Sequence, residues 1–176
     1  VTSLAVSSDG QQLISGGNDR DVRIWDTDSN FRIQQTTIGS HNSPITTVAQ
    51  QIDGALMASG SLDGVVKIWS SVTGAEAASV KAHGRPIVGL AFSQDGETLA
   101  SRDAQGEVKL WQVSDISDGG ALASFKVDSK QESNDKTPLP RLLPLALNMN
   151  GSQVVFGAAN GGLRIWKKSS KEFQDL

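Results

Sequence analysis

Three side chains in the first half of the chain are of the types that form a nucleophilic triad: His41, Ser59 and Asp63. In a triad the histidine accepts the proton of the serine hydroxyl, and the carboxylate orients the imidazole. The activated serine oxygen then attacks the substrate. The residue types alone therefore permit one nucleophilic site centred on Ser59.

The same residue types recur elsewhere in the chain, each time at a fixed distance from a tryptophan. The set around Ser59 ends at Trp69, ten residues later. Two further sets contain Ser15, Asp19 and Trp25, and His83, Ser101 and Trp111, with Gln105 in place of the acid. A catalytic site is built once per domain, whereas a packing device recurs with the fold. We therefore expect structural roles for these residues.

Metal and cofactor sites are not expected either. The two histidines belong to different sets, and no cluster of His, Asp or Glu accompanies either of them in the sequence. Each Asp-Gly pair offers a single acid, which is too few oxygen ligands for calcium. The glycine-rich segment 157–162 is predicted to be a turn between strands rather than a phosphate loop. We predict no catalytic residue, no metal and no cofactor.

The composition narrows the class of partner. The chain has 176 residues, 38% of them hydrophobic, and a formal net charge of −3, so it offers no broad basic surface for nucleic acid. No apolar stretch approaches the roughly 18 residues that a membrane span needs. The absence of cysteine excludes disulfides and fits a reducing compartment. We therefore expect a cytoplasmic protein that neither binds nucleic acid nor inserts into a membrane.

A pattern that occurs four times explains why the residue sets recur. Each copy begins with an Asp-Gly or Asn-Gly turn and closes with an apolar segment that ends in tryptophan. The four tryptophans of the chain are Trp25, Trp69, Trp111 and Trp166, at intervals of 44, 42 and 55 residues. A period of about 40–45 residues is typical of β-propellers, in which one repeat forms one four-stranded blade.

Apolar and polar residues alternate within each copy, which predicts four short strands per copy and an all-β fold without helices. The Asp-Gly and Asn-Gly pairs suit the tight turns between such strands. We place the four blades at about residues 1–38, 39–80, 81–127 and 141–176.

The segment 128–140 interrupts the repeat between the third and fourth blades. It is polar and contains two prolines. One interpretation is a solvated, mobile insertion. The other is a recognition loop, because propellers carry function on loops that rigid blades hold in place.

These repeats resemble those of the WD-repeat β-propeller family over essentially the whole chain. The repeat of that family has a Gly-His pair near its start and a Trp-Asp pair near its end. Here Ser40-His41 and Ala82-His83-Gly84 stand at the first position, and Trp25-Asp26 is the only literal Trp-Asp pair. One such motif alone is weak evidence, but four copies in register make the resemblance specific.

The resemblance implies a buried chain of hydrogen bonds that links Trp, Ser, His and Asp within a blade. An indole N–H needs an acceptor, a hydroxyl both accepts and donates, and a histidine continues the chain to a carboxylate. Blade two has the complete set. The histidine of blade one would precede Val1, and blade four has Phe156 and Asn160 in place of serine and aspartate. We therefore predict a complete chain in blade two, a partial one in blade three and none in blade four.

Rings of this family usually contain seven or eight blades. An open arc of four blades would leave apolar faces uncovered at both ends, which repeat proteins avoid. We therefore expect further propeller blades from the parent chain. A four-bladed ring and an eight-bladed ring made of two chains are the alternatives.

The resemblance further implies a non-enzymatic scaffold that docks a protein or peptide on one face of the ring. Besides the segment 128–140, the loops expected to form that face contain Asn18, Arg20, Asn42, Leu62, Arg85 and Ala104. One alternative is the sensing or regulatory domain of a larger signalling enzyme. Another is a propeller enzyme with a site in the central channel, although the first strands of the blades carry no acid or histidine that such a site needs.

Overall fold

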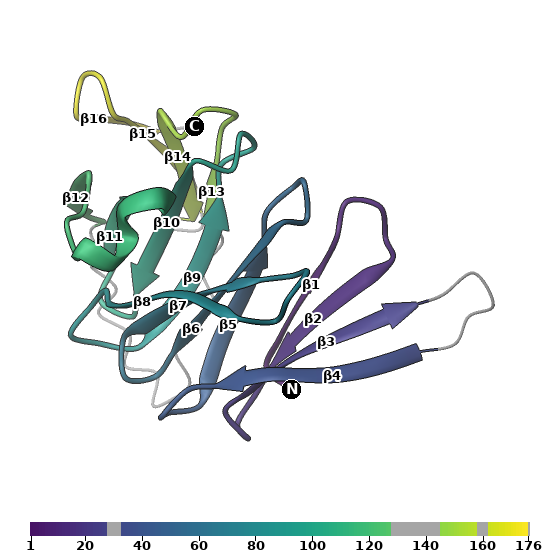
Figure 1. Cartoon of the computed structure of the whole chain (residues 1–176). Coiled ribbons are helices and arrows are strands. Elements are labelled where there is room, and N and C mark those ends of the chain that lie inside the picture. Colours follow the sequence, from purple (N-terminus) through teal and green to yellow (C-terminus); the bar gives the residue numbers. More distant parts are fainter. Residues whose placement is uncertain (28–32, 128–144, 158–161, 176) are drawn as a thin grey trace.

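The computed structural model describes the whole chain except residues 28–32, 128–144, 158–161 and 176. The described residues form four antiparallel sheets of four strands each, and every sheet is built from consecutive strands. Figure 1 shows the sheets standing next to one another in chain order. The predicted all-β fold of four-stranded blades is confirmed.

The first two sheets occupy the N-terminal half of the chain. Sheet one contains β1 (Ser3–Val6), β2 (Gln12–Gly16), β3 (Asp21–Thr27) and β4 (Ile33–Ser40). Sheet two contains β5 (Ile45–Gln50), β6 (Leu56–Ser61), β7 (Val65–Ser70) and β8 (Glu76–Lys81). Each strand pairs with the next one in sequence, so each sheet is a simple meander.

The other two sheets follow the same order. Sheet three contains β9 (Ile87–Phe92), β10 (Thr98–Asp103), β11 (Glu107–Gln112) and β12 (Ala123–Lys126). Sheet four contains β13 (Leu145–Leu147), β14 (Gln153–Gly157), β15 (Leu163–Lys167) and β16 (Glu172–Asp175). The predicted insertion at 128–140 lies outside the described residues, as does Asn160.

The turns between the first two strands of the sheets follow the predicted pattern, Asp-Gly in the first three sheets and Asn-Gly in the fourth. In sheet one, the Asp9 carboxylate accepts hydrogen bonds from the Ser7 hydroxyl (2.5 Å) and the Gln11 amide (3.0 Å). Gly10 follows with a φ of 71°, a conformation that glycine adopts at little cost. Ser93, Asp95 and Gly96 repeat this arrangement in sheet three. The local sequence therefore sets where each first hairpin reverses.

A short 3-10 helix contradicts the expectation that the chain leaves no room for a helix. It spans Val113–Asp118 between β11 and β12, and Gly119 ends it with a φ of 71°. Ile116 is its buried residue and belongs to the same apolar cluster as Val80 and Ala82. This connection is longer than a hairpin turn, and the apolar Ile116 folds it back onto the body of the molecule.

The core lies between neighbouring sheets rather than inside any one of them. Trp69 packs so closely on β4 that a Cβ atom at Gly39 would lie 2.3 Å from its ring. Hydrogen bonds also join adjacent sheets where their first strands begin. Thr2, just before β1, donates from Oγ1 to the Ile45 carbonyl, and Thr46 in β5 donates from Oγ1 to the Ile87 carbonyl, both at 2.5 Å. Each sheet is therefore fixed mainly by its neighbours.

The two outermost faces of this array have no neighbouring sheet among the residues that the structure describes. On β1 the side chains of Leu4 and Val6 are 58% and 61% exposed, whereas Ala5 between them packs toward the core. On β15 the Leu163 side chain is 46% exposed, whereas Trp166 is buried. Within the described part of the chain, no helix is long and apolar enough to cross a membrane.

Candidate functional site

The second sheet contains a buried chain of hydrogen bonds between a tryptophan, a serine and a histidine. Trp69 Nε1 donates to Ser59 Oγ over 2.8 Å, and the same oxygen lies 2.7 Å from His41 Nε2. Ser59 Oγ accepts from the indole, so its own proton can be donated to the imidazole. The Ser59 side chain is fully buried, where no substrate could reach it as a nucleophile. The arrangement therefore suits packing rather than catalysis.

Asp63 does not continue this chain, contrary to the prediction of a complete set in blade two. Its Oδ1 accepts hydrogen bonds from the Ser61 hydroxyl (2.5 Å) and the Val65 amide (3.3 Å). His41 Nδ1 is buried without a hydrogen-bond partner among the described residues. Burial is the main cause that lowers the pKa of His41 to about 4, and the positive charge of the nearby Lys67 is the second. The imidazole is therefore neutral at pH 7.

The first sheet carries a shorter version of the arrangement, and the fourth sheet lacks its serine. Trp25 Nε1 donates to Ser15 Oγ over 2.8 Å, while the exposed Asp19 carboxylate pairs with the Arg23 guanidinium. The hydrogen bond from Arg23 lowers the pKa of Asp19 below its ordinary value. In the fourth sheet Phe156 occupies the place of the serine and Trp166 stacks on Phe125, with ring centroids 4.3 Å apart.

In the third sheet the acids come from positions that the spacing did not indicate. Trp111 Nε1 donates to Ser101 Oγ (2.8 Å), and that oxygen lies 2.7 Å from His83 Nε2. His83 Nδ1 faces Glu107 Oε2 at 3.2 Å and Asp103 Oδ2 at 3.8 Å. The spacing of the repeats predicts the acid at position 105, where the chain has Gln105 instead.

These three residues also correct the expectation that no acidic cluster accompanies a histidine. The ligand atoms of His83, Asp103 and Glu107 all lie within 4.8 Å of one another. Asp103 ends β10 and Glu107 begins β11, so the two acids flank one tight turn and meet beside the imidazole. The signal in the sequence is a pair of acids on either side of a turn glycine, Gly106, in a copy that also has a histidine.

The six residues expected on one face are all exposed and lie in the turns and loops of the first three sheets. They are Asn18, Arg20, Asn42, Leu62, Arg85 and Ala104. Backbone hydrogen bonds of 2.9 Å join these turns to the loops beside them. His41 N donates to Arg20 O, which links the turn of sheet one to the loop that enters sheet two. Leu62 N donates to Pro44 O and Ala104 N to Pro86 O, which link the turns of sheets two and three to the loops that enter those same sheets. We call this set of turns and loops the loop rim.

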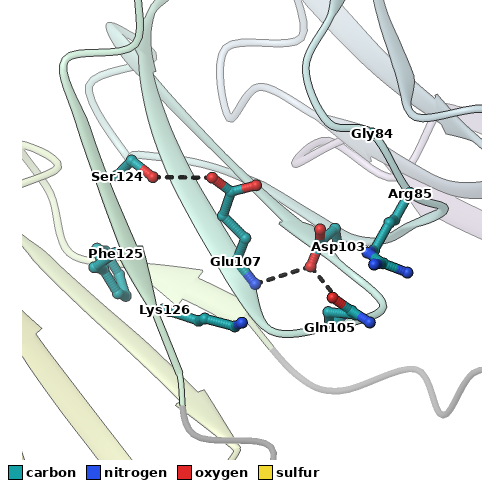
Figure 2. Close-up of a pocket in the computed structure, with 8 residues that line it drawn as sticks. All are labelled: Gly84, Arg85, Asp103, Gln105, Glu107, Ser124, Phe125 and Lys126. Atoms are coloured by element: carbon teal, nitrogen blue, oxygen red, sulfur yellow. Dashed lines mark hydrogen bonds between the residues drawn. The ribbon is translucent and has the colours of Figure 1, made fainter.

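An open cleft of about 760 Å³ lies on the loop rim at the third sheet. Its lining residues are Gly84, Arg85, Asp103, Gln105, Glu107, Ser124, Phe125 and Lys126. Figure 2 shows that β10, β11 and β12 and the loop before β9 supply them, with Asp103 Oδ1 accepting from the Gln105 and Glu107 amides. The cleft thus joins two of the predicted rim loops to the buried His83 network.

Comparison with known protein families gives one match, to the family model described as "WD40: WD domain, G-beta repeat". The matched ranges are 1–26, 32–70 and 74–112, more than half of the chain. They cover the first two sheets and most of the third.

Curated relatives align with parts of the chain only. WD repeat-containing protein slp1 of Schizosaccharomyces pombe is 39% identical over 83 residues, which cover 46% of this chain and 17% of slp1. Anaphase-promoting complex subunit cdc20 of Dictyostelium discoideum is 35% identical over 78 residues, 42% of this chain and 16% of that protein. Target of rapamycin complex subunit wat1 of S. pombe is 33% identical over 69 residues, 39% of this chain and 22% of that protein. The alignments therefore span less than a quarter of these relatives.

Proposed function

The chain belongs to the WD40 repeat family, and we propose that it is a non-enzymatic scaffold that docks a protein or peptide on its loop rim. The observation that carries this proposal is the construction of the rim. Exposed side chains project from turns that backbone hydrogen bonds fix to the neighbouring loops. A surface held in this way keeps its shape before a partner arrives, which lowers the entropic cost of binding.

The names of the relatives support a scaffold role. One is called a subunit of the anaphase-promoting complex and another a subunit of a target of rapamycin complex, and each name describes that protein. Scaffolding is a common role of WD-repeat proteins, and a shared repeat makes the role a reasonable proposal here. The full burial of Ser59 and Ser101 also argues against a nucleophilic site in the histidine networks.

The native molecule, in this proposal, contains further blades that cover both outer faces. The support is the exposed apolar residues there, Leu4 and Val6 on one side and Leu163 on the other. Within the chain, the corresponding faces between sheets are buried by a neighbouring sheet. A neighbour of the same kind would remove these residues from water in the same way.

The docking surface can be tested with a matched pair of double variants. Leu62→Asp with Arg85→Glu changes the loop rim. Ile52→Asp with Gln94→Glu makes similar changes on exposed residues of the turns at the opposite rim. Proteins that co-purify with the tagged chain from its source cells are quantified for each variant.

We expect the rim variant to lose its specific interactors by about 10-fold or more, the loss that truncating one or two interface hot spots produces. The control should retain them, since its residues lie on the other side of the sheets. Retention by the rim variant together with loss in the control would place the docking surface on the opposite rim and contradict the proposal.

A further inference from the structure

We propose that His83, Asp103 and Glu107 bind a zinc ion in the cleft of the third sheet. This inference is independent of the scaffold role. The ligand atoms are His83 Nδ1, Asp103 Oδ2 and Glu107 Oε2, which lie within 4.8 Å of one another. In a tetrahedral zinc site with bonds of about 2.0–2.2 Å, neighbouring ligand atoms are about 3.4 Å apart. The observed separations of 3.2 Å and 3.8 Å from Nδ1 to the two carboxylates bracket that value.

The cluster has more acceptors than its own donors can satisfy. One imidazole N–H faces two carboxylates, and Glu107 Oε2 takes it at 3.2 Å. Asp103 lines the cleft, and its Oδ2 lies 3.8 Å from His83 Nδ1, beyond hydrogen-bond distance. A carboxylate oxygen in this position is available to a cation that enters from the cleft. A cation held between Asp103, Glu107 and His83 would remove this imbalance.

The residues around the cluster hold the ligands in place. Asp103 Oδ1 is fixed by the amides of Gln105 (2.9 Å) and Glu107 (2.8 Å), which leaves Oδ2 for a metal. On the other side of the imidazole, His83 Nε2 lies 2.7 Å from Ser101 Oγ, so it can donate there once Nδ1 binds a metal. Metal-binding histidines usually donate their second ring N–H to such an acceptor.

The two carboxylate oxygens of Glu107 have different surroundings. Glu107 Oε1 accepts from Ser124 at 3.2 Å and lies 3.8 Å from Lys109 Nζ, so Oε2 is the oxygen available to the ion.

The ligand set favours zinc over the common alkaline-earth ions. Calcium and magnesium prefer sites made of oxygen alone, whereas an imidazole with two carboxylates suits zinc. The cleft gives the ion a path from solvent, and Gln105 or water from the cleft can supply the fourth ligand. Arg85 and Lys126 also line the cleft and act against the cation, so we expect an affinity that depends on both acids.

The second sheet provides an internal control. His41 Nε2 contacts Ser59 in the same geometry, yet Ser61 and Val65 stand at the positions of Asp103 and Glu107. The chain contains only these two histidines. A zinc site in the third sheet must therefore affect His83 and leave His41 unchanged, whereas adventitious binding has no reason to distinguish them.

Zinc titration of the chain against a chromophoric chelator at pH 7.5 tests the proposal. We expect one ion per chain. Glu107→Gln and Asp103→Asn should each weaken binding by about 10-fold or more, because each removes one ligand charge. Glu76→Gln, at an acid paired with Lys67 in the second sheet, should leave it unchanged. Visible absorption of the cobalt-loaded chain should show a tetrahedral or five-coordinate site that Glu107→Gln removes.

Glu107 is half-buried, and Glu107→Gln keeps a hydrogen-bond acceptor for His83, so this variant should fold. It therefore tests the zinc site even if Asp103→Asn disturbs the turn. NMR of the two imidazoles should show zinc-dependent shifts for His83 alone. The proposal is overturned if zinc does not bind at about millimolar concentration. It is equally overturned if Glu107→Gln binds zinc like the unaltered chain, or if His83 does not respond to zinc.

Discussion

Two of the buried serines, Ser59 and Ser101, each satisfy two polar groups at once, an indole N–H and a histidine nitrogen. Replacing either by alanine leaves both groups buried without that partner, and we expect each change to lower the free energy of unfolding by about 1–3 kcal/mol. Gln105→Ala should cost much less, because its side chain is exposed. Chemical denaturation of the three variants measures this, and equal losses at all three positions would contradict it.

Stability should fall between pH 6.5 and pH 4 because of His41. Its pKa is about 4 in the folded chain against an ordinary value of 6.5, so the unfolded state binds the proton more readily in this window. The contribution is therefore complete above pH 6.5 and is lost as the pH falls toward 4. We expect a loss of about 2 kcal/mol between pH 7.5 and pH 5 from this residue.

Denaturation of the unaltered chain and of His41→Gln at these two pH values measures that contribution. The variant should show a smaller dependence, with the remainder coming from His83, whose pKa is also lowered by burial. If the free energy of unfolding depends on pH in His41→Gln as it does in the unaltered chain, His41 is not the source of that dependence. The carboxylates of Asp9 and Asp19, whose pKa values are lowered by hydrogen bonds from Ser7 and Arg23, act only at more acidic pH.

The sequence predicted which serines meet which tryptophans but not which acids meet the histidines. A serine and a tryptophan ten residues apart lie on adjacent paired strands, so regular register brings them together: Ser59 pairs with Lys67, two residues before Trp69. The acids stand at a turn, where a shift of two residues changes the direction of a side chain. Spacing therefore pointed to Asp63 and Gln105, whereas the closest acids to a histidine are Asp103 and Glu107.

At the scale of the elements, the close approach of neighbouring sheets limits the size of the side chains that fit on the outer strands. Gly39 on β4 lies against the Trp69 ring, where a Cβ atom would come within 2.3 Å. Gly84, in the loop before β9, has no atom within 4 Å of the position of an added Cβ. Neither glycine has a positive φ, so the two differ in packing rather than in backbone strain.

Gly39→Ala should therefore destabilise the chain by about 1–3 kcal/mol, the usual cost of overpacking a filled interface. Gly84→Ala should be neutral or slightly stabilising, because alanine reduces the freedom of the unfolded chain. Thermal unfolding of the two variants compares them directly. Similar melting temperatures would mean that sheets one and two do not approach as closely as the structure places them.

Alternation of apolar and polar residues was sufficient to predict the strands but not the connection after β11. The pattern predicts no helix, whereas a 3-10 helix precedes β12, which begins at Ala123. The helix has one buried apolar residue, Ile116, and a single residue gives no period that could be recognised. Its position depends on a contact with the cluster around Val80, which lies far away in the sequence.

At the scale of the whole molecule, the repeat predicts how sheets stack but not how many complete the ring. Among the described residues, the main contacts between sheets join neighbours in chain order, as in other repeat proteins, so the local sequence does not determine the number of blades. What bears on the number of blades is that the outer faces of the first and fourth sheets are uncovered. Burying apolar surface contributes roughly 25 cal/mol per Å², and both faces forgo that contribution in the isolated chain.

The isolated 176-residue chain should consequently associate or bind a hydrophobic dye. The side chains responsible are Val1, Leu4 and Val6 on the first sheet and Leu163 on the fourth, all exposed. Leu4→Lys with Val6→Lys should reduce association, because charges oppose stacking of that face, while Val72→Lys, on an exposed turn of the second sheet, should not. Small-angle scattering and dye fluorescence distinguish the outcomes. A compact monomer without dye binding would instead favour a closed four-bladed ring, in which the first and fourth sheets cover each other.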